Sequence, residues 1–546
     1  MNSHSKASMI LVSLFIFLLQ SVTSGPAPVA AGQNEIRYGG KYSVALSSEP
    51  EALDPAFITG IYAVTVANNL YDGLVEFDKD LNIVPAIARM WKISRDHRTY
   101  SFDLRRGVEF HNGREVTADD FAFSISRILH PETHSPVASL FLNIHGAKAF
   151  HEGRADNVSG LEVLGRYKLK ITLDKPFSPF LSILAMVNAR VVPKEVIGPE
   201  FSKNPVGTGP FRFDRWRAQQ EIILTANQQY YQQRPYLDTL YFQIYPNIEW
   251  EKVFSNFERG YLDHSIIPSN KYDEIQSSPA YLARYQLVSK PTLSLVYVGI
   301  NCRQKPLDDP KVRRALTMAV DTDAVVKSIT KRGSIPARGI LPPGIAGFDP
   351  RLKGYGYNPV QARELLAQAG YPGGEGIPPL DIWTVSKSES VKEELAAYRK
   401  YLAAIGITLN PRVAENWKHF IQMINDKKVP LYYAAWYADY PDPDNFLFVL
   451  CHSASRTNRM GYENNTIDRL LENARQEVDY IKRIQTYRDV QDRVMQDAPL
   501  IPQHVNSFNY LFQPWVKGIE VSYLGAAYIP FRKIWIDYLA TSQAKR

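Results

Sequence analysis

The stretch Leu431-Tyr-Tyr-Ala-Ala-Trp-Tyr-Ala-Asp439-Tyr-Pro-Asp-Pro-Asp-Asn445 joins an apolar run to a polar turn. The residues up to Ala438 carry no charge and are rich in aromatic side chains, which predicts a strand inside a core. Pro441 and Pro443 cannot donate to a β-ladder, so the strand should stop at Asp439. A buried carboxylate there needs a cation or hydrogen-bond donors. Its partner is either local, in the turn or on an internal Arg, or the cation of a ligand.

The composition describes a soluble globular protein with more than one core. A chain of 546 residues predicts two or three lobes. Its 63 basic and 56 acidic residues give a formal charge of +7, but they are interspersed without a basic block or stripe. We therefore expect no nucleic-acid partner. The 32 Tyr and 8 Trp suit either an adaptable, hydrated binding surface or β-rich packing.

Residues 1–24 have the proportions of a secretory signal peptide. The apolar run from Met9 to Leu19 is shorter than the ~20 residues that span a bilayer. Small residues follow it, so we expect cleavage after Ser24 or, alternatively, after Ala31; an uncleaved anchor is the other interpretation. No Cys lies near these positions, which excludes lipid attachment there. The mature chain is expected to be soluble outside the inner membrane.

Cys302 and Cys451 are the only two cysteines of the chain. In an oxidising compartment they could form one disulfide, or they could remain two buried thiols. The sequence does not supply the distance between them, so both alternatives stay open.

The chain shows none of the catalytic or metal-binding signatures that we searched for. It has no Gly-x-Ser-x-Gly elbow, no phosphate-binding loop of the Gly-x4-Gly-Lys type and no His-Glu-x-x-His motif. Asp439, Asp442 and Asp444 could hold a hard cation, but the rest of a calcium loop is missing. We therefore expect no catalytic residue, no metal site and no cofactor.

Local signals predict alternating strands and helices, which is typical of an α/β fold. The predicted strands are 39–46, 100–105, 167–173, 293–299, 380–383 and 431–438, with a further strand near Ile407 and β-like material around Trp515, Tyr523 and Trp535. The predicted helices are 63–70, 117–129, 309–320, 358–370, 390–402, 466–478 and 481–497, with an apolar helix after Pro179. Gly207 and Gly209 lack the third glycine of a dinucleotide loop, so they predict a tight crossover between lobes.

Several short motifs occur in one order along the chain: Leu53-Asp54-Pro55, Leu70-Tyr-Asp-Gly-Leu-Val75, Phe110-His-Asn-Gly113, Thr117-Ala-Asp-Asp-Phe121, Gly207-Thr-Gly-Pro-Phe211, Val312-Arg-Arg-Ala-Leu316, Ala362 to Gly370 and Trp436-Tyr-Ala-Asp-Tyr440. With these motifs the sequence resembles the family 5 extracytoplasmic solute-binding proteins, the oligopeptide- and dipeptide-binding class of ABC importers. The resemblance covers nearly the whole mature chain. It is more specific for the family than for the ligand.

The resemblance implies an α/β, two-lobed periplasmic-binding-protein fold (type II, Venus-flytrap) with an additional small domain. Lobe I would be discontinuous, with residues 33–78, 205–297 and 515–546. The additional domain would cover 79–204, and lobe II would cover 298–514. Gly207 and Leu293 would then mark crossings between these parts.

The resemblance also implies the binding residues. Peptide-binding relatives hold an extended ligand between the lobes, pair a Trp-x-Ala-Asp strand with its main chain, and bind its α-ammonium with the Asp. Carried over to this sequence, the implied ligand-binding residues are Asp439 for the amine, Ala435, Trp436 and Tyr437 for main-chain bonds, Thr59, Gly60 and Ile61 for the facing segment of lobe I, and Trp417 for a side-chain pocket. Ala435 replaces a Gly of a relative, and Tyr437 is bulky. The basic residue for a ligand carboxylate cannot be placed.

We therefore expect a monomeric periplasmic protein that closes on a peptide by hinge motion and delivers it to inner-membrane permease subunits. A separate subunit would consume ATP, so no nucleotide site is expected. One alternative is another solute on the same fold, such as an oligosaccharide or a chelated metal, although the acid at Asp439 favours an amine. The other is a secreted peptidase, for which the chain shows no nucleophile–base pair or metal signature.

Overall fold

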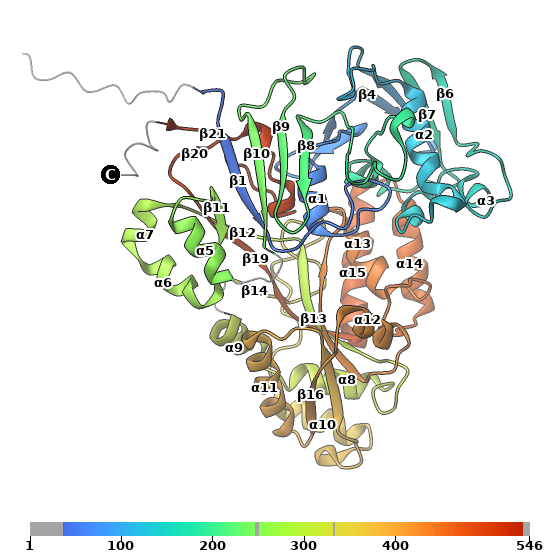
Figure 1. The fold of residues 1–546 in the computed structure, drawn as a ribbon. Helices are drawn as coiled ribbons and strands as arrows, with labels where there is room; N and C mark the ends of the chain where they lie inside the picture. Colours follow the sequence, from blue (N-terminus) through green and yellow to red (C-terminus); the bar gives the residue numbers. More distant parts are fainter. Residues whose placement is uncertain (1–35, 246–249, 331–332, 539–546) are drawn as a thin grey trace, which may run out of the picture. The chain divides into compact units, whose positions relative to one another are not determined.

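The structure is a computed structural model that describes residues 36–245, 250–330 and 333–538. The predicted signal peptide, residues 1–24, lies outside the described residues. Residues Arg37–Arg546 form one compact unit in which strands and helices alternate, as Figure 1 shows. Within the described part of the chain, no helix is both long enough and apolar enough to cross a membrane.

The strands form four larger sheets and two short ladders. The larger sheets have the strand orders β1 (Lys41–Leu46), β10 (Thr239–Ile244), β9 (Glu221–Ala226), β8 (Phe211–Arg217); β4 (Ala88–Ile93), β5 (Thr99–Leu104), β7 (Lys168–Thr172), β6 (Leu161–Gly165); β11 (His264–Ile266), β19 (Ser507–Phe512), β12 (Gln286–Pro291); and β14 (Ile335–Pro336), β18 (Leu500–Val505), β13 (Ser294–Ile300), β17 (Leu431–Tyr437), β15 (Leu380–Thr384), β16 (Leu409–Val413). The short ladders are β2 (Val75–Phe77) with β3 (Ile83–Pro85) and β20 (Val516–Lys517) with β21 (Trp535–Ile536).

The α-helices of the described residues are α1 (Ile61–Ala67), α2 (Ala118–Leu129), α3 (Ala147–His151), α4 (Phe180–Leu184), α5 (Trp250–Glu258), α6 (Tyr272–Ser277), α7 (Pro279–Arg284), α8 (Pro310–Met318), α9 (Thr322–Val325), α10 (Pro359–Gln368), α11 (Glu389–Ala403), α12 (Trp417–Asn425), α13 (Asp444–Cys451), α14 (Asn465–Gln476) and α15 (Tyr480–Asp497). Three of them begin at the caps that the sequence predicts. Asp120 accepts a hydrogen bond from the backbone N–H of Thr117 (2.8 Å), Asp309 from that of Lys311 (2.8 Å), and Asn358 from that of Gln361 (3.0 Å). These side chains satisfy donors that the first helical turn leaves free.

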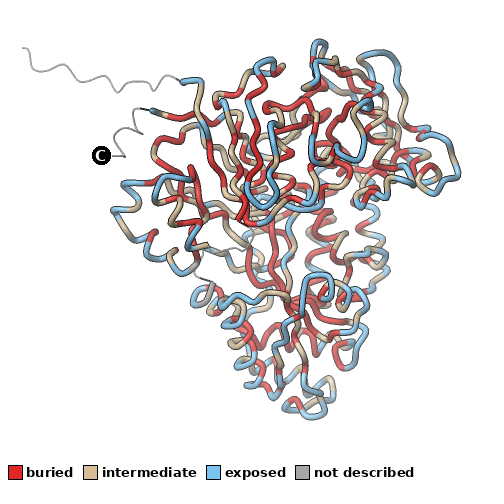
Figure 2. The backbone as a smooth tube through the Cα atoms, viewed as in Figure 1, coloured by how far each residue is buried: buried red, intermediate tan, exposed pale blue. Residues whose placement is uncertain are grey.

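The six-stranded sheet is buried on both faces, and the strand period explains how. Leu295 and Tyr297 of β13 pack with Tyr432 in a cluster that also contains residues of α12 to α15. The intervening Val296 and Val298 point to a second cluster, which contains residues of α8, α10 and α11. Successive side chains of a strand point to opposite faces, so an uninterrupted apolar run fills both clusters. Figure 2 shows these central strands mostly buried.

Strand β17 leaves the core halfway along its length. Leu431, Tyr432 and Tyr433 are buried, whereas the residues from Ala434 to Tyr437 alternate between intermediate and exposed. The predicted strand is therefore confirmed, but the prediction that all of it lies inside a core is wrong. The neighbouring strand β15 pairs only with Leu431 and Tyr432, so on that side no described strand pairs with the second half of β17, whereas β13 pairs along the whole strand on the other side.

Two pairs of strands run from one sheet directly into the next. Strand β12 continues into β13 through Thr292 and Leu293, and β18 continues into β19 through Asn506. Hydrogen bonds join the two connections to each other. Thr292 donates its backbone N–H to the Asn506 carbonyl at 2.9 Å. Asn506 in turn donates its backbone N–H to the Ser294 hydroxyl at 3.0 Å. These paired crossings connect the three-stranded sheet with the six-stranded one.

The predicted glycine turn before β8 lies directly on another backbone segment. A Cβ atom on Gly207 would come within 1.9 Å of the Leu70 carbonyl oxygen, and one on Gly209 within 2.5 Å of the Leu70 carbonyl carbon. Gly209 also donates its N–H to that oxygen at 2.9 Å. Close backbone approach, rather than phosphate binding, explains these two glycines.

Cys302 and Cys451 are free thiols in the structure. Burial raises the pKa of Cys302 to about 11 and that of Cys451 further above its ordinary value. The charge of Cys302 is a second cause of the shift at Cys451, so the two side chains lie near each other. Of the two alternatives that the sequence leaves open, the structure therefore has the buried thiols.

Candidate functional site

The second half of β17 offers an unpaired strand edge. On one side Ala435 and Trp436 pair with Val296 and Leu295 of β13. On the other side the pairing with β15 ends at Tyr432, and no other described strand takes its place. A strand edge of this kind can pair with the main chain of an extended ligand.

Asp439 follows this edge and has no ion-pair partner. Among the described residues, no nitrogen of Lys, Arg or His lies within 4.0 Å of its carboxylate. The two acids of the following turn differ, since Asp442 binds Arg483 at 2.6 Å and Asp444 binds Arg475 at 2.6 Å. The local explanation for an acid in this turn, pairing with an internal Arg, therefore applies to Asp442 and Asp444 but not to Asp439.

Asn445 orients the end of the strand, and the sequence analysis did not identify it. Its side-chain oxygen accepts hydrogen bonds from the Asp439 backbone N–H at 3.1 Å and from the Trp436 indole N–H at 3.2 Å. Desolvation raises the pKa of Asp439, and a side-chain hydrogen bond from Asn445 offsets part of that rise. Asn445 is only 1% exposed, so it holds both neighbours from within the protein. In the sequence, Asn445 stands in a Pro- and Asp-rich stretch, which predicted that it lies in a turn but not that it holds the strand end.

Asp439 is exposed at the surface but partly desolvated. Its surface is accessible to solvent, yet desolvation raises the pKa of its carboxyl group above the ordinary value. Solvent therefore reaches the carboxylate while surrounding protein displaces much of the bulk water. Ala438 on one side contacts the cluster of β13 and α12 to α15, and Tyr440 on the other is buried in a cluster built from residues 56–191.

Tyrosine side chains connect the strand end with residues 59–62. Asn506 donates a hydrogen bond to the Tyr437 hydroxyl at 2.8 Å, which ties β17 to the crossing between the sheets. Burial raises the pKa of Tyr510 in β19, and the charges of Tyr62 and Tyr437 raise it further. Tyr62, at the start of α1, and Tyr437 are therefore both close to Tyr510.

Thr59, Gly60 and Ile61 form an exposed corner at the start of α1. Gly60 precedes the helix in an extended conformation, and a Cβ atom built on it would have no neighbour within 4 Å. Thr59 and Gly60 also line a cavity of about 100 Å³ together with residues 48–52. This corner presents backbone groups to open space, as a ligand-facing segment requires.

Trp417 begins α12 and is 58% exposed, which excludes the core position that is common for Trp. Its ring lies 5.9 Å from that of Phe420. Phe420 belongs to the cluster against which Trp436 packs, so α12 covers the same face of the sheet that carries the strand end. Of the predicted residues, the structure thus places Ala435, Trp436, Tyr437 and Asp439 on one strand end and Trp417 on a helix that packs on the same sheet. Thr59, Gly60 and Ile61 lie on a separate exposed corner at the start of α1.

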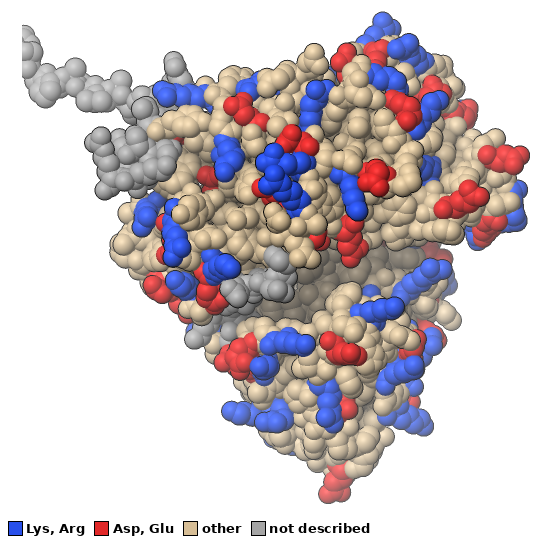
Figure 3. All heavy atoms as spheres, viewed as in Figure 1, with Lys and Arg blue, Asp and Glu red and all other residues tan. Residues whose placement is uncertain are grey.

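The described residues contain no group of three or more His, Cys, Asp or Glu side chains placed to hold a metal ion. Basic and acidic side chains are interspersed over the face of the molecule in Figure 3. The arrangement around Asp439 can bind a cation and an extended main chain. It offers no paired nucleophile and base.

An open strand edge that leads to an acid suits the binding of an extended solute. The family model "Bacterial extracellular solute-binding proteins, family 5 Middle" matches residues 82–458, and the chain belongs to this family. Its fold is the α/β, two-lobed fold of the periplasmic binding proteins. The resemblance inferred from the short motifs is thereby confirmed.

Three known proteins define the relationship further. The "Dipeptide-binding protein" of Escherichia coli is 29% identical over 510 residues, which cover 87% of this chain and 91% of that protein. "Heme-binding protein A" of Haemophilus influenzae is 29% identical over 560 residues, which cover 97% of this chain and 99% of that protein. The solved structure of the periplasmic binding protein DppA from Helicobacter pylori, in complex with the peptide STSA, has a TM-score of 0.76 at 27% identity and covers 92% of this chain and 98% of its own.

Proposed function

We propose that this protein is the solute-binding component of an ABC importer and that it binds extended peptides. The observation that carries the proposal is the end of β17, where Ala434 to Trp436 have a strand partner on one side only and the strand leads to Asp439, an acid with no cation of the described residues within 4.0 Å. A peptide supplies the matching groups, because its main chain can add a strand and its free amino terminus is a cation. Asp439 fixes the register by binding that amine.

The other binding residues follow from this placement. The backbone of Ala435, Trp436 and Tyr437 faces the ligand main chain, and Thr59, Gly60 and Ile61 contact it from the opposite side. Trp417 borders a side-chain pocket. Peptides of different sequence can bind, since strand addition reads main-chain groups and water fills roomy side-chain pockets.

We also propose the division of the chain that this mechanism needs. Lobe I comprises residues 33–78, 205–297 and 515–546, the additional domain 79–204, and lobe II 298–514. The paired crossings at Thr292–Leu293 and Asn506 act as the hinge on which the lobes close. The mature protein, after removal of residues 1–24, is a periplasmic monomer that delivers its ligand to permease subunits in the inner membrane.

A chelated metal such as haem is the second candidate, because a relative that covers 97% of this chain is named a heme-binding protein. The site argues against it. The carboxylates of a haem would require cations, whereas the strand end presents an acid, Asp439, with no cation within 4.0 Å. The same acid disfavours a neutral oligosaccharide.

Identification of the natural ligand tests this proposal. The full-length protein would be expressed with its own signal sequence and purified from the periplasm without denaturation. It would then be unfolded, and the released small molecules analysed by mass spectrometry. We expect a mixture of short peptides with free amino termini, and the same peptides should remain intact on long incubation with fresh protein. A released sugar or haem, or hydrolysis of the peptides, would contradict the proposal.

A further inference from the structure

Two hydrogen bonds join the additional domain of the proposed division to the end of helix α14. Ser178 donates its backbone N–H to the Arg475 carbonyl at 2.8 Å and its hydroxyl to the Glu477 carbonyl at 2.7 Å. Both acceptors lie at the C-terminal end of α14, where a helix leaves its carbonyl groups without partners. The guanidinium of Arg475 also lies 5.3 Å from the centre of the Phe177 ring. The additional domain therefore caps a helix of lobe II.

Tyr440 makes a second contact across the same division. It follows Asp439 directly, and its side chain is buried in a cluster that consists mainly of residues of the additional domain. Its hydroxyl donates a hydrogen bond to Asp444 at 2.8 Å, and Arg475 binds the same carboxylate at 2.6 Å. The residue beside the proposed amine site and the helix end that the additional domain caps are therefore linked through Asp444.

On its other side the additional domain is fixed to lobe I by buried polar contacts. Arg127 forms an ion pair with Asp54, whose side chain is buried. The buried Asn188 donates its side-chain N–H groups to the carbonyls of Pro55 and Ile58, at 2.9 and 3.0 Å. Breaking such contacts would leave buried polar groups without partners, which is costly. We therefore expect the additional domain and lobe I to move as one body.

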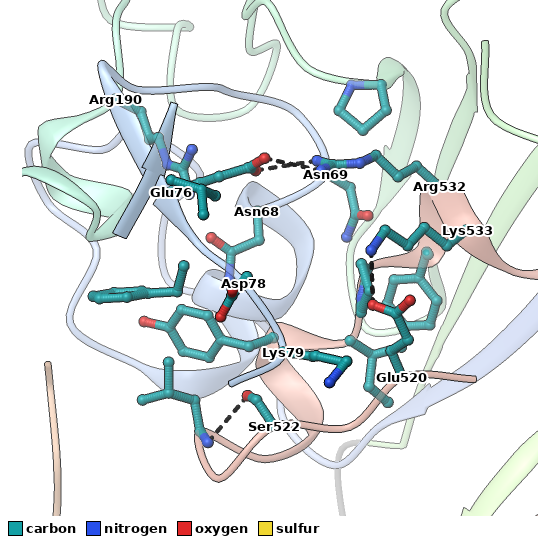
Figure 4. A pocket seen from close by; sticks show the side chains of 18 residues that line it. Asn68, Asn69, Glu76, Asp78, Lys79, Arg190, Glu520, Ser522, Arg532 and Lys533 are labelled. Atoms are coloured by element: carbon teal, nitrogen blue, oxygen red, sulfur yellow. Dashed lines mark hydrogen bonds and ion pairs between the residues drawn. The ribbon is translucent and has the colours of Figure 1, made fainter. Parts of the chain in front are cut away.

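The ladder of β2 and β3, at the boundary between these two parts, is held in the same way. Glu76 of β2 accepts two hydrogen bonds from Arg532 of lobe I, at 2.9 and 3.1 Å, in the wall of a cavity of about 170 Å³ (Figure 4). Arg190 of the additional domain lines the same cavity. Desolvation raises the pKa of Glu76, but the charge and hydrogen bonds of Arg532, and then the charge of Arg190, lower it overall. Charges from both parts thus stabilise one buried carboxylate.

The contact with lobe II is of another kind. Ser178, Arg475 and Glu477 are only half-buried, and the next residue, Val478, is exposed. At such positions water can replace a hydrogen bond with little net loss of free energy. If lobe II rotates about the crossings between the sheets, this contact opens while the buried contacts with lobe I persist.

We infer that Phe177 and Ser178 form a latch, which holds the end of α14 when the lobes are closed on a peptide and releases it when they open. The inference rests on the proposed function, because a latch has a role only if the lobes close on a ligand. The additional domain thereby contributes to peptide affinity through lobe II. Ser178 is a positioning residue and not a ligand contact.

Hydrogen–deuterium exchange of the wild-type protein tests the latch directly. The probe is the tightest binder, by isothermal titration calorimetry, among di-, tri- and tetra-alanine and synthetic copies of the peptides released from the purified protein. At saturating probe the Ser178 amide should exchange ~10-fold or more slowly, because its hydrogen bond to Arg475 exists only in the closed form. The Val191 amide is the control. It donates to the Asp72 carbonyl of lobe I at 3.1 Å, and its exchange should not change.

Two serine variants separate a latch from a permanent contact. Ser178→Ala should weaken binding of the probe ~2- to 10-fold, mainly through faster dissociation, and leave the unfolding free energy of the ligand-free protein unchanged. Ser135 is the matched control, because its hydroxyl donates to the Ala56 carbonyl of lobe I at 2.6 Å. Ser135→Ala should lower the unfolding free energy and leave the affinity unchanged.

The outcomes separate this inference from the proposed function. Equal exchange of the Ser178 amide with and without saturating probe, or a Ser178→Ala variant that behaves like Ser135→Ala, would overturn the latch and leave peptide binding intact. If the purified protein released no peptide and none of the alanine peptides bound, the proposed function would fail and the inference with it. The exchange experiment needs no variant, so it decides the question even if a substitution disturbs folding.

Discussion

Asp439 differs from Asp442 and Asp444, because no Lys, Arg or His nitrogen of the described residues lies within 4.0 Å of its carboxylate. We expect Asp439→Asn to weaken peptide binding by ~2–5 kcal/mol, the cost of leaving a charged partner unpaired. This corresponds to an affinity ~30-fold to several thousand-fold lower. Calorimetry measures this loss of affinity, with one peptide in two forms, one with a free amino terminus and one N-acetylated. The acetylated peptide should bind the wild type weakly and be almost insensitive to the substitution.

Asp444 provides the matched control. It is fully buried and accepts hydrogen bonds from Arg475 at 2.6 and 2.9 Å and from Tyr440 at 2.8 Å. Breaking such a buried pair costs ~3–5 kcal/mol of stability, so Asp444→Asn should lower the unfolding free energy. Asp439→Asn should leave the fold stable. If both variants lost binding and stability together, Asp439 would have only a structural role.

As the pH is lowered, peptide affinity should begin to fall at a higher pH than it would if Asp439 had the ordinary pKa of an aspartate. Desolvation raises the pKa of Asp439, and protonation removes the charge that binds the amine. The same shift has a consequence for stability. The folded, ligand-free protein binds this proton more tightly than the unfolded chain, so deprotonation of Asp439 costs stability as pH rises.

Titration curves of affinity and of unfolding free energy, for wild type and Asp439→Asn, check both effects. The affinity curve of the variant should lose the acidic drop. The unfolding free energy of the wild type relative to the variant should decrease as pH rises through the raised pKa. Parallel curves for the two proteins would contradict the assignment.

At the scale of elements, the corner before α1 and the turn before β8 contain glycines for opposite reasons. Gly60 faces open space in an extended conformation, whereas a Cβ on Gly207 would meet the Leu70 carbonyl at 1.9 Å. We expect Gly60→Leu to change stability by less than ~0.5 kcal/mol and to weaken peptide binding, because its side chain enters the ligand's space. Gly207→Ala should lower stability by ~2 kcal/mol or more. Chemical denaturation and calorimetry distinguish them, and unchanged peptide affinity in Gly60→Leu would remove residues 59–61 from the site.

The elements show which features a sequence can predict. Thr117, Asp309 and Asn358 were correctly placed at helix starts because a cap depends on residues only a few positions away. The exposure of Trp417 and the open edge of β17 were not predictable. Both depend on where α12 and β15 end relative to β17, which distant parts of the chain decide.

The candidate site shows the same limit. Asp439 was recognisable because an acid followed an apolar strand and because short motifs resembled a family. Nothing local indicated that Asn445 folds back over the strand to hold Trp436 and Asp439.

At the scale of the whole molecule, two strand connections join the three-stranded and six-stranded sheets. If they form the hinge, a peptide that contacts both Asp439 and residues 59–61 will draw the lobes together. We expect the radius of gyration in small-angle X-ray scattering to decrease when a tight-binding peptide is added to the ligand-free protein. The decrease should be absent in Asp439→Asn at the same peptide concentration. An unchanged radius at saturating peptide would argue for a preformed, rigid site.

The unpaired edge of β17 also presents a hazard, because exposed strand edges promote association between protein molecules. Here the edge that lacks a partner spans only the second half of β17 and leads to an acid, Asp439, and to Pro441. Short edges that end in a charge and a proline are among the ways in which proteins prevent pairing with a second copy. The same few residues that admit the main chain of one short peptide are therefore too few to join one copy of the protein to the next.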